Sequence, residues 1–452
     1  KKRSTFSGKL GFVLSAAGAS VGLGNIWRFP YLAAKYGGGI FFIIYIALTL
    51  TFGYTMIIAE TSLGRMTRKS PVGAYQSFGK SRWLSFGGWI NAIIPLLIVP
   101  YYSVIGGWVI KYLISFVTGQ VSQAAGDNYF TGFITESVEP IVWFAVFLLL
   151  TAAVVFIGVQ KGIEKASTIL MPILIILIVC ISIFCATRPG ALAGVKYYLL
   201  PDIKHFSATT VLAAMGQLFY SMSLAMGIMI TYGSYMKKED DLRDSVRKIE
   251  IFDTVVALLA GLMIVPSVFA FSGGSKEALS KGPSLMFVTM PKVFNSMKIG
   301  SLIGAGFFIL VLFAALTSAI SLLETNVSII CDKLHWSRKK STVVATLYCL
   351  IVGGLISLGY GPLSFIKIIG MNLLDFFDFI SNSVLMPIVA MLTCIFIGYI
   401  VKPKTIIDEV ELGGKTFKEK KFYVVMLKYV APVCLLLILL FAVSEALGLI
   451  KV

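Results

Sequence analysis

The chain has 452 residues, of which 57% are hydrophobic and only 13% are charged, and its formal net charge at pH 7 is +17. This composition excludes an ordinary soluble globular protein and indicates a polytopic membrane protein. The positive charge does not indicate nucleic-acid binding, because the basic residues cluster in short loops between apolar segments, as they do in membrane proteins.

Apolar stretches long enough to cross a bilayer recur along nearly the whole chain. We predict eleven spans, at residues 9–34, 39–66, 84–117, 139–159, 163–186, 206–236, 241–271, 298–333, 341–360, 364–400 and 422–449. By position, the first ten form two sets of five, with residues 1–186 as a first repeat, 206–400 as a second, and 422–449 as an additional helix.

Lysine and arginine are unevenly shared between the loops on the two sides of these spans. With the N-terminal tail inside, the cytoplasmic loops and that tail carry 26 of the 39 Lys and Arg residues. The asymmetry predicts a multi-pass protein of the cell (inner or plasma) membrane with its N-terminus in the cytoplasm and, after eleven spans, its C-terminus outside.

The first span is interrupted at AGASVGLGNIWRFP, residues 17–30. Its three closely spaced glycines disfavour a continuous helix, and polar Asn25 and Arg28 follow. An unwound stretch survives in lipid only where it lines a cavity or is buried in protein, and its freed carbonyls and amides can bind a cation and an anionic group. The alternative is close helix packing through small residues.

A second irregular span supports this interpretation. Residues 216–227, GQLFYSMSLAMG, place two glycines around several polar residues in the sixth span, which is the first of the second set of five. Interrupted spans at corresponding positions of two halves indicate the binding site of an inverted-repeat transporter.

Three further spans carry features that have both a functional and a structural interpretation. In the eighth, Thr317 and Ser318 can face a common cavity or bond to their own preceding turn. In the seventh, Asp253 is either a functional intramembrane carboxylate or an interfacial charge. In the fifth, Gly162 and Pro172 indicate a plain kink or a half-helix that unwinds easily.

Motifs along essentially the whole chain resemble the neurotransmitter:sodium symporter family, whose bacterial members carry amino acids. They are AGASVGLGNIWRFP, GGGIFF soon after it, GQLFYSMSL, the FAALTS run and LLDFFDF. The resemblance implies the leucine-transporter fold: an all-α polytopic membrane protein of eleven transmembrane helices, a 5+5 inverted repeat with discontinuous helices 1 and 6, and one extra helix.

The resemblance also implies two Na⁺ sites made of oxygen ligands, as a hard cation requires. The first would use Ser20, Asn25, Ser221 and Asp253 together with the substrate carboxylate. The second would use Gly18, Val21, Ala314, Thr317 and Ser318. The family usually has Asn where this chain has Asp253, and a carboxylate there supplies a negative charge, so chloride is not expected to be required.

By the same resemblance, the substrate would lie between the two interrupted spans. The position where amine-selective members carry an acid is Ala19 here, so the substrate is expected to carry an α-carboxylate. The expected substrate-binding residues are Ala19, Ser20, Leu23, Gly24, Ile98, Tyr102, Tyr220, Ser221, Ser223, Met226, Ser318 and Leu322.

Two gates are expected around this site. Arg28 and Asp378 would pair on the outer side, and Arg3 and Asp332 on the cytoplasmic side, with Phe6 nearby where the family often has Trp. Residues 272–297 would form an extracellular lid. The buried acid Glu60 is expected to stabilise the first-span break.

The function that follows is a sodium-coupled symporter that imports hydrophobic, aliphatic and aromatic L-amino acids by alternating access, with the lipid bilayer as its environment. It would not be an enzyme, because no nucleophile–base pair or metal cluster lies at depth. The alternatives are a proton-coupled amino-acid transporter of the same fold, using Asp253 or Glu60, and a channel or non-transporting membrane sensor. The sequence predicts no oligomeric state.

Overall fold

The computed structural model describes residues 3–79, 82–274 and 284–446, and within these residues the fold is helical, with only two isolated β-bridges. Nine helical stretches of the described residues are long and apolar enough to cross a membrane. They are Gly39–Thr67, Leu84–Val117, Glu139–Ile157, Val159–Ala186, Leu242–Ser272, Gly300–Leu334, Arg338–Leu358, Leu373–Val401 and Lys420–Ser444.

These nine stretches are built from several labelled helices, some of them separated by short π-helical turns. In chain order they are α3 (Gly39–Leu48), η2 (Thr49–Gly53), α4 (Tyr54–Thr67), α6 (Arg82–Val117), α9 (Glu139–Ile157), η3 (Val159–Glu164), α10 (Lys165–Ala186), α14 (Leu242–Ser272), α17 (Gly300–Leu334), α18 (Arg338–Leu358), α19 (Leu373–Asp378), η7 (Phe379–Leu385), α20 (Met386–Ile395), η8 (Phe396–Val401), α22 (Lys420–Val425), η9 (Met426–Val430) and α23 (Ala431–Ala446).

The first and sixth predicted spans are broken. The first consists of α1 (Lys9–Ser20), η1 (Gly24–Arg28) and α2 (Phe29–Lys35), with a bend of 52° at the break. The sixth consists of α12 (Ala208–Ser221) and α13 (Ile228–Gly233), and residues 222–227 between them are not helical. With the nine stretches above, these two broken spans give the eleven that the sequence predicts.

The remaining short helices cap the two ends of the bundle. They are α5 (Pro71–Gln76), α7 (Val121–Ala124), α8 (Tyr129–Thr135), α11 (Leu192–Leu199), η4 (Ile203–His205), η6 (Leu285–Thr289), α16 (Met290–Asn295) and α21 (Pro403–Val410). In the predicted lid, Phe287 is buried and its ring packs on those of Trp108, Tyr112 and Phe130. Residues 275–283 of that lid lie outside the described residues.

The tenth span begins at Leu373, nine residues later than the predicted start at 364. Residues 359–372 contain three glycines and a proline, which favour turns over a helix, and Asn372 caps the helix by accepting a hydrogen bond from the Asp375 amide. The predicted span began too early because residues of this loop are hydrophobic, although they do not form a helix.

Neighbouring helices satisfy backbone groups that prolines free inside the membrane. Pro100 in α6 has no N–H to donate to the Leu96 carbonyl, and the Tyr348 hydroxyl of α18 donates to that carbonyl at 3.2 Å. This arrangement keeps a proline-containing span compatible with lipid.

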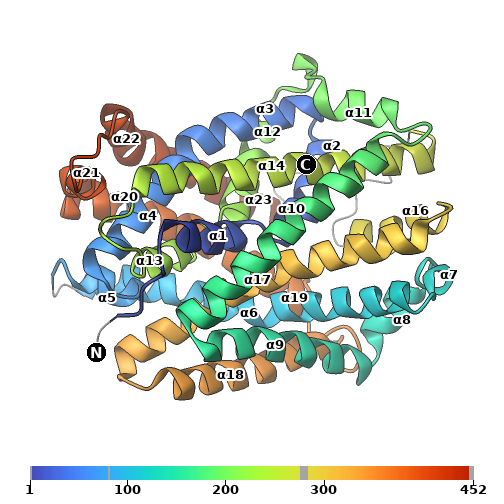
Figure 1. Cartoon of the computed structure of the whole chain (residues 1–452), viewed down its shortest axis with the longest axis horizontal. Coiled ribbons are helices and arrows are strands. Elements are labelled where there is room, and N and C mark those ends of the chain that lie inside the picture. Colours follow the sequence, from blue (N-terminus) through green and yellow to red (C-terminus); the bar gives the residue numbers. More distant parts are fainter. Residues whose placement is uncertain (1–2, 80–81, 275–283, 447–452) are drawn as a thin grey trace.

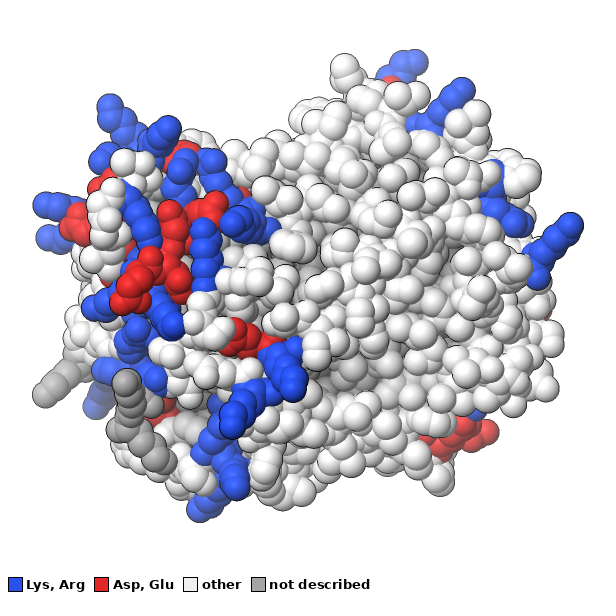
Figure 2. All heavy atoms as spheres, viewed as in Figure 1, with Lys and Arg blue, Asp and Glu red and all other residues white. Residues whose placement is uncertain are grey.

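Figure 1 shows α1 in the middle of the bundle, surrounded by longer helices, and α1 packs against α10, α14 and α17. Lysine and arginine side chains gather at the end of the molecule that holds the N-terminus, α5, α13 and α21, while the other end carries few (Figures 1 and 2). A broken helix therefore lies at the core of a bundle whose two ends differ in charge.

Candidate functional site

The two helix breaks face each other at the centre of the bundle. The Ser223 hydroxyl in the sixth-span break donates to the Ala19 carbonyl at 2.8 Å, and the Gln217 side chain donates to the Gly24 carbonyl at 2.9 Å. Side chains of the sixth span thus donate hydrogen bonds to backbone carbonyls at and beside the first-span break.

The sixth-span break has a strained backbone. Ser223, Ala225 and Gly227 all have positive φ, at 53°, 57° and 72°. Such conformations are unfavourable for non-glycine residues and persist only where surrounding contacts hold them. One of these contacts is the hydrogen bond from the Ala225 amide to the buried Glu60 carboxyl, 2.8 Å long. Glu60, expected from the sequence to stabilise the first-span break, is therefore hydrogen-bonded to the sixth-span break instead.

Backbone carbonyls of the first break converge on one hydroxyl of the eighth span. Ser318 Oγ lies 3.3 Å from the Gly18 oxygen, 3.1 Å from the Ala19 oxygen and 3.3 Å from the Val21 oxygen. A hydroxyl has only one hydrogen to donate, so it cannot satisfy three carbonyls at once. An oxygen cluster with this surplus of acceptors suits a hard cation.

The other two residues predicted for this second cation site lie beside the cluster. Thr317 Oγ1 is 3.1 Å from the Ala314 carbonyl oxygen and 3.0 Å from that of Phe313. A Cβ added to Gly18 would lie 3.1 Å from the Thr317 Cβ, which shows how closely the spans approach. Thr317 therefore does bond to its own preceding turn, whereas Ser318 reaches across to the broken helix.

The residues predicted for the first cation site form a buried network around one carboxylate. Asp253 Oδ1 accepts from the Asn25 side-chain amide and from the Ser221 hydroxyl, both at 2.8 Å, and Asp253 Oδ2 accepts from the Tyr45 hydroxyl at 2.7 Å. The fourth residue, Ser20, lies close by, with its hydroxyl 3.5 Å from the Met222 carbonyl. Asp253 is fully buried, so the interfacial alternative does not describe it.

The donors of both clusters are oxygens of carbonyls, hydroxyls, an amide and one carboxylate. Among the described residues there is no group of three or more His, Cys, Asp or Glu side chains that suits a transition metal. Neutral oxygens with one or no carboxylate match a hard ion of low charge, such as sodium, better than zinc or iron.

A small cavity of about 20 Å³ lies between the two breaks. Eleven of the twelve predicted substrate-binding residues line it, and Gly22 lines it as well; Ser221 instead contacts Asp253. The lining residues are Ala19, Ser20, Gly22, Leu23, Gly24, Ile98, Tyr102, Tyr220, Ser223, Met226, Ser318 and Leu322.

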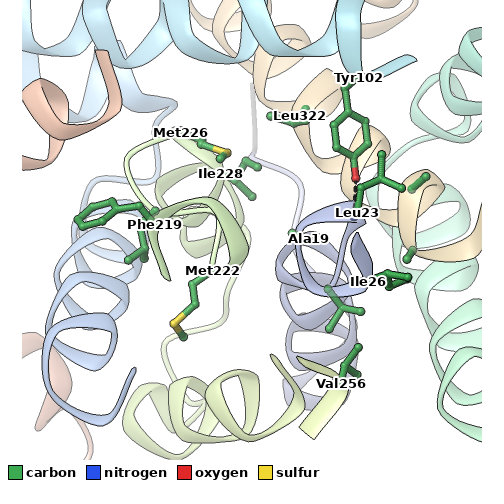
Figure 3. Packing of buried hydrophobic residues seen from close by; sticks show 14 of the residues in the cluster. Ala19, Leu23, Ile26, Tyr102, Phe219, Met222, Met226, Ile228, Val256 and Leu322 are labelled. Atoms are coloured by element: carbon green, nitrogen blue, oxygen red, sulfur yellow. Dashed lines mark hydrogen bonds between the residues drawn. The ribbon is translucent and has the colours of Figure 1, made fainter. Parts of the chain in front are cut away.

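Polar groups meet at one side of this cavity, and apolar side chains form the rest. The Tyr102 hydroxyl accepts a hydrogen bond from the Leu23 amide at 3.2 Å, drawn as a dashed line in Figure 3. Met226 lies on the opposite side of the space, and Leu322 lies between the two (Figure 3). This arrangement offers an amide and a hydroxyl to a polar head and an apolar wall to a side chain.

The residues of the predicted outer gate do not contact each other directly. The Arg28 guanidinium lies over the Tyr220 ring, 5.0 Å from its centroid. Asp378 accepts from the Tyr101 hydroxyl at 3.0 Å and from the Asn382 amide at 2.6 Å. In the described part of the chain no ion pair joins Arg28 to Asp378, so their pairing stays a prediction.

The residues of the predicted inner gate are in contact. Arg3 pairs with Asp332 at 2.7 Å, and its guanidinium also donates to the hydroxyls of Ser234 and Ser328. Asp332 accepts a second hydrogen bond from the Ser70 amide. Phe6, where the family often has Trp, is fully buried and packs edge-on against Tyr232 and Tyr235.

Sequence reasoning missed Tyr45 and Gln217, which bond to Asp253 and to the Gly24 carbonyl. Tyr45 has no glycine, proline or charge directly beside it, whereas Gln217 follows Gly216 in the irregular segment of the sixth span, so its position did offer a signal. Only the folded arrangement shows that these side chains reach the two breaks.

Two broken helices that face each other around oxygen clusters suited to a cation and a small cavity are typical of a membrane transporter that couples its cargo to a cation. The family model of the sodium:neurotransmitter symporter family matches residues 3–140 and 133–449. The chain belongs to this family of sodium-dependent symporters, which are multi-pass membrane transporters and not enzymes.

Similar proteins support the same assignment. An uncharacterized sodium-dependent transporter, YhdH, of Bacillus subtilis is 36% identical over 97% of this chain and 98% of its own length. An uncharacterized sodium-dependent transporter of Haemophilus influenzae is 31% identical, with 98% of each chain covered. The crystal structure of MhsT in complex with L-phenylalanine has a TM-score of 0.88 and 36% identity, covering 98% of this chain and 100% of that one.

Proposed function

We propose that this chain is a symporter that uses the sodium gradient to import hydrophobic L-amino acids, aliphatic through aromatic. The observation that carries the proposal is the cavity between the two breaks, which has an amide and a hydroxyl at one side and apolar walls elsewhere. Its wall at Ala19 has no acid to hold an amine, so recognition rests on the α-carboxylate. The similarity to MhsT, whose structure holds L-phenylalanine, supports this substrate class.

Two Na⁺ ions travel with each substrate in this proposal. One binds at Asn25, Ser221 and Asp253 with the Ser20 carbonyl and the substrate carboxylate, and the other binds at the Ser318 cluster. The surplus of carbonyl oxygens around Ser318 supports the second site. Asp253 supplies the negative charge that a chloride ion otherwise brings, so transport does not require chloride.

Alternating access moves the cargo inward. Sodium and substrate bind from outside, the site closes, and separation of Arg3 from Asp332 opens the cytoplasmic side. In the cell membrane the potential contributes roughly 2.3 kcal/mol per charge per 100 mV to this inward step. The basic end of the molecule lies in the cytoplasm in this arrangement, together with the N-terminus, and the C-terminus lies outside.

The closest alternatives are proton coupling through Asp253 or Glu60, and a sensor that binds its ligand without moving it. Both acids are fully buried beside the breaks, which is the observation that favours the first alternative.

The decisive experiment is uptake of labelled leucine and tryptophan into proteoliposomes under an imposed inward gradient of sodium, potassium or protons. We expect saturable uptake with sodium alone, and its loss in Asn25→Ala and Thr317→Ala. Equal uptake with a proton gradient would assign coupling to the buried acids. Specific binding without uptake would identify a sensor.

A further inference from the structure

A second, larger cleft lies on the outer surface of the bundle, between the second, seventh and eleventh spans and near the basic end of the molecule. Its volume is about 540 Å³, within the range of ligand pockets in proteins. Apolar side chains form its walls, and two of them, Leu50 and Ile251, are about 60% exposed. Exposed apolar side chains on a membrane span face hydrocarbon, so this cleft opens towards lipid.

The opposite part of the cleft is polar and contains two buried groups without partners. Tyr54 and Glu250 line it and are only 4% and 3% exposed. Neither the Tyr54 hydroxyl nor the Glu250 Oε1 atom has a partner at hydrogen-bond geometry, although the Arg243 side chain lies near the Tyr54 hydroxyl. Because unpaired buried polar groups carry a free-energy cost, these two atoms indicate a ligand that can donate hydrogen bonds to them.

The charges beside these atoms define the complementary ligand. Glu419 pairs with both Arg243 and Arg247, and the hydrogen bond from Arg243 lowers the pKa of the Glu419 carboxyl, which is therefore ionised at neutral pH. Arg247 remains about half exposed and retains donors for an anion. An arginine with free donors thus lies one helical turn from Glu250, whose Oε1 atom has no partner, and this arrangement suits a zwitterionic head.

We propose that this cleft binds a phospholipid with a primary ammonium head group, such as phosphatidylethanolamine. The head-group phosphate contacts Arg247, the ammonium donates to Glu250 and the Tyr54 hydroxyl, and one acyl chain lies along the apolar walls formed by Ile46, Leu50, Ile251, Val255 and Phe422. Binding does not depend on transport, so the proposal can be tested even if the substrate or coupling ion differs from that proposed above.

The test is native mass spectrometry of the delipidated full-length protein with phosphatidylethanolamine, its N-trimethylated analogue phosphatidylcholine, and phosphatidylglycerol, all with the same acyl chains. A hydrogen bond to a charged group contributes about 1.5–3 kcal/mol, so we expect about tenfold or stronger retention of phosphatidylethanolamine over the other two. Glu250→Gln should abolish this preference, and Arg247→Ala should weaken binding of all three lipids.

Matched controls come from the same basic end of the molecule. Glu411→Gln changes an acid outside the cleft, and Lys248→Ala removes the cation next to Arg247 in sequence; both should bind as the wild type does. Equal retention of the three lipids by the wild type would overturn the proposal, as would strongest binding of phosphatidylglycerol or an unchanged preference in Glu250→Gln. If Glu250→Gln does not fold, the wild-type comparison and Tyr54→Phe, which removes only the hydroxyl, decide the question.

Discussion

Gly22 and Gly24 allow the backbone of the first-span break to pack closely against neighbouring side chains at the proposed substrate cavity. A Cβ on Gly22 would lie 2.6 Å from Ser318 Oγ and 2.9 Å from the Tyr102 hydroxyl, and a Cβ on Gly24 would lie 2.5 Å from the Tyr220 ring. Real Cβ atoms essentially never come this close, so the small size of glycine is required here as well as its flexibility.

We therefore expect Gly22→Ala to weaken amino-acid binding strongly. Overpacking costs about 1–3 kcal/mol, which corresponds to about a 5- to 150-fold loss of affinity. Equilibrium binding of labelled leucine to purified protein measures this. The control is Gly216→Ala in α12, where no atom lies within 4 Å of the added Cβ, and its affinity should be unchanged. Normal binding in Gly22→Ala would show that the substrate lies elsewhere.

Asp253 of the seventh span accepts three hydrogen bonds, from Asn25 of the first span, Tyr45 of the second and Ser221 of the sixth. If its charge replaces chloride, wild-type uptake should be unchanged when gluconate replaces chloride. Asp253→Asn should lower the apparent sodium affinity about tenfold or more in gluconate, because the charge of the ligand set controls cation affinity. Chloride should restore part of the sodium affinity that Asp253→Asn has lost. Loss of wild-type uptake in gluconate would contradict the role given to Asp253.

At the level of elements, the inner gate connects the N-terminal segment to α17 through Arg3 and Asp332. Asp332→Asn removes the charge of this pair but keeps an oxygen for the Ser70 amide. Because a charge-assisted hydrogen bond contributes about 1.5–3 kcal/mol, the inward-open population should rise about tenfold or more. Thiol labelling of a cysteine replacing Ser321, buried one turn from Ser318, reports this opening.

A matched change at the opposite end controls for loss of a surface charge. Asp127→Asn removes an exposed acid that pairs with Lys292 of α16 and should leave the labelling of position 321 unchanged. Equal labelling rates in Asp332→Asn and the wild type would mean that Arg3 and Asp332 do not keep the inner side closed.

The helix breaks could be predicted because glycine clusters and polar residues stand out within apolar spans. The π-helical form of turns such as η2 and η3 could not be predicted, because a glycine such as Gly162 in η3 indicates an irregular helix but not its hydrogen-bond spacing. The sequence also could not predict which break Glu60 would bond to, since either break lies within reach of an acid in the second span. The tenth span begins later than predicted, which shows that hydropathy identifies apolar residues but not whether they form a helix.

On the scale of the whole molecule, the sequence predicts the number of spans because the bilayer imposes a minimum apolar length on every spanning helix. It does not predict which side chains meet at the centre. Asn25, Tyr45 and Ser221 come from three spans, and their meeting around Asp253 of a fourth span follows from packing that no local pattern encodes. The charge difference between the two ends is, in contrast, visible in the sequence and is clear in Figure 2.

The difference in charge between the two ends of the molecule predicts its orientation in the membrane. Gly132 in α8 and Lys418 in the last basic loop lie at opposite ends, and both positions are exposed. In intact cells, a membrane-impermeant maleimide should modify Gly132→Cys but reach Lys418→Cys only after permeabilisation, as peptide mass spectrometry measures. The physical reason is that basic loops are retained on the cytoplasmic side during insertion. Uptake by both variants verifies folding, and the reverse labelling pattern would place the N-terminus and the basic gate of Arg3 outside.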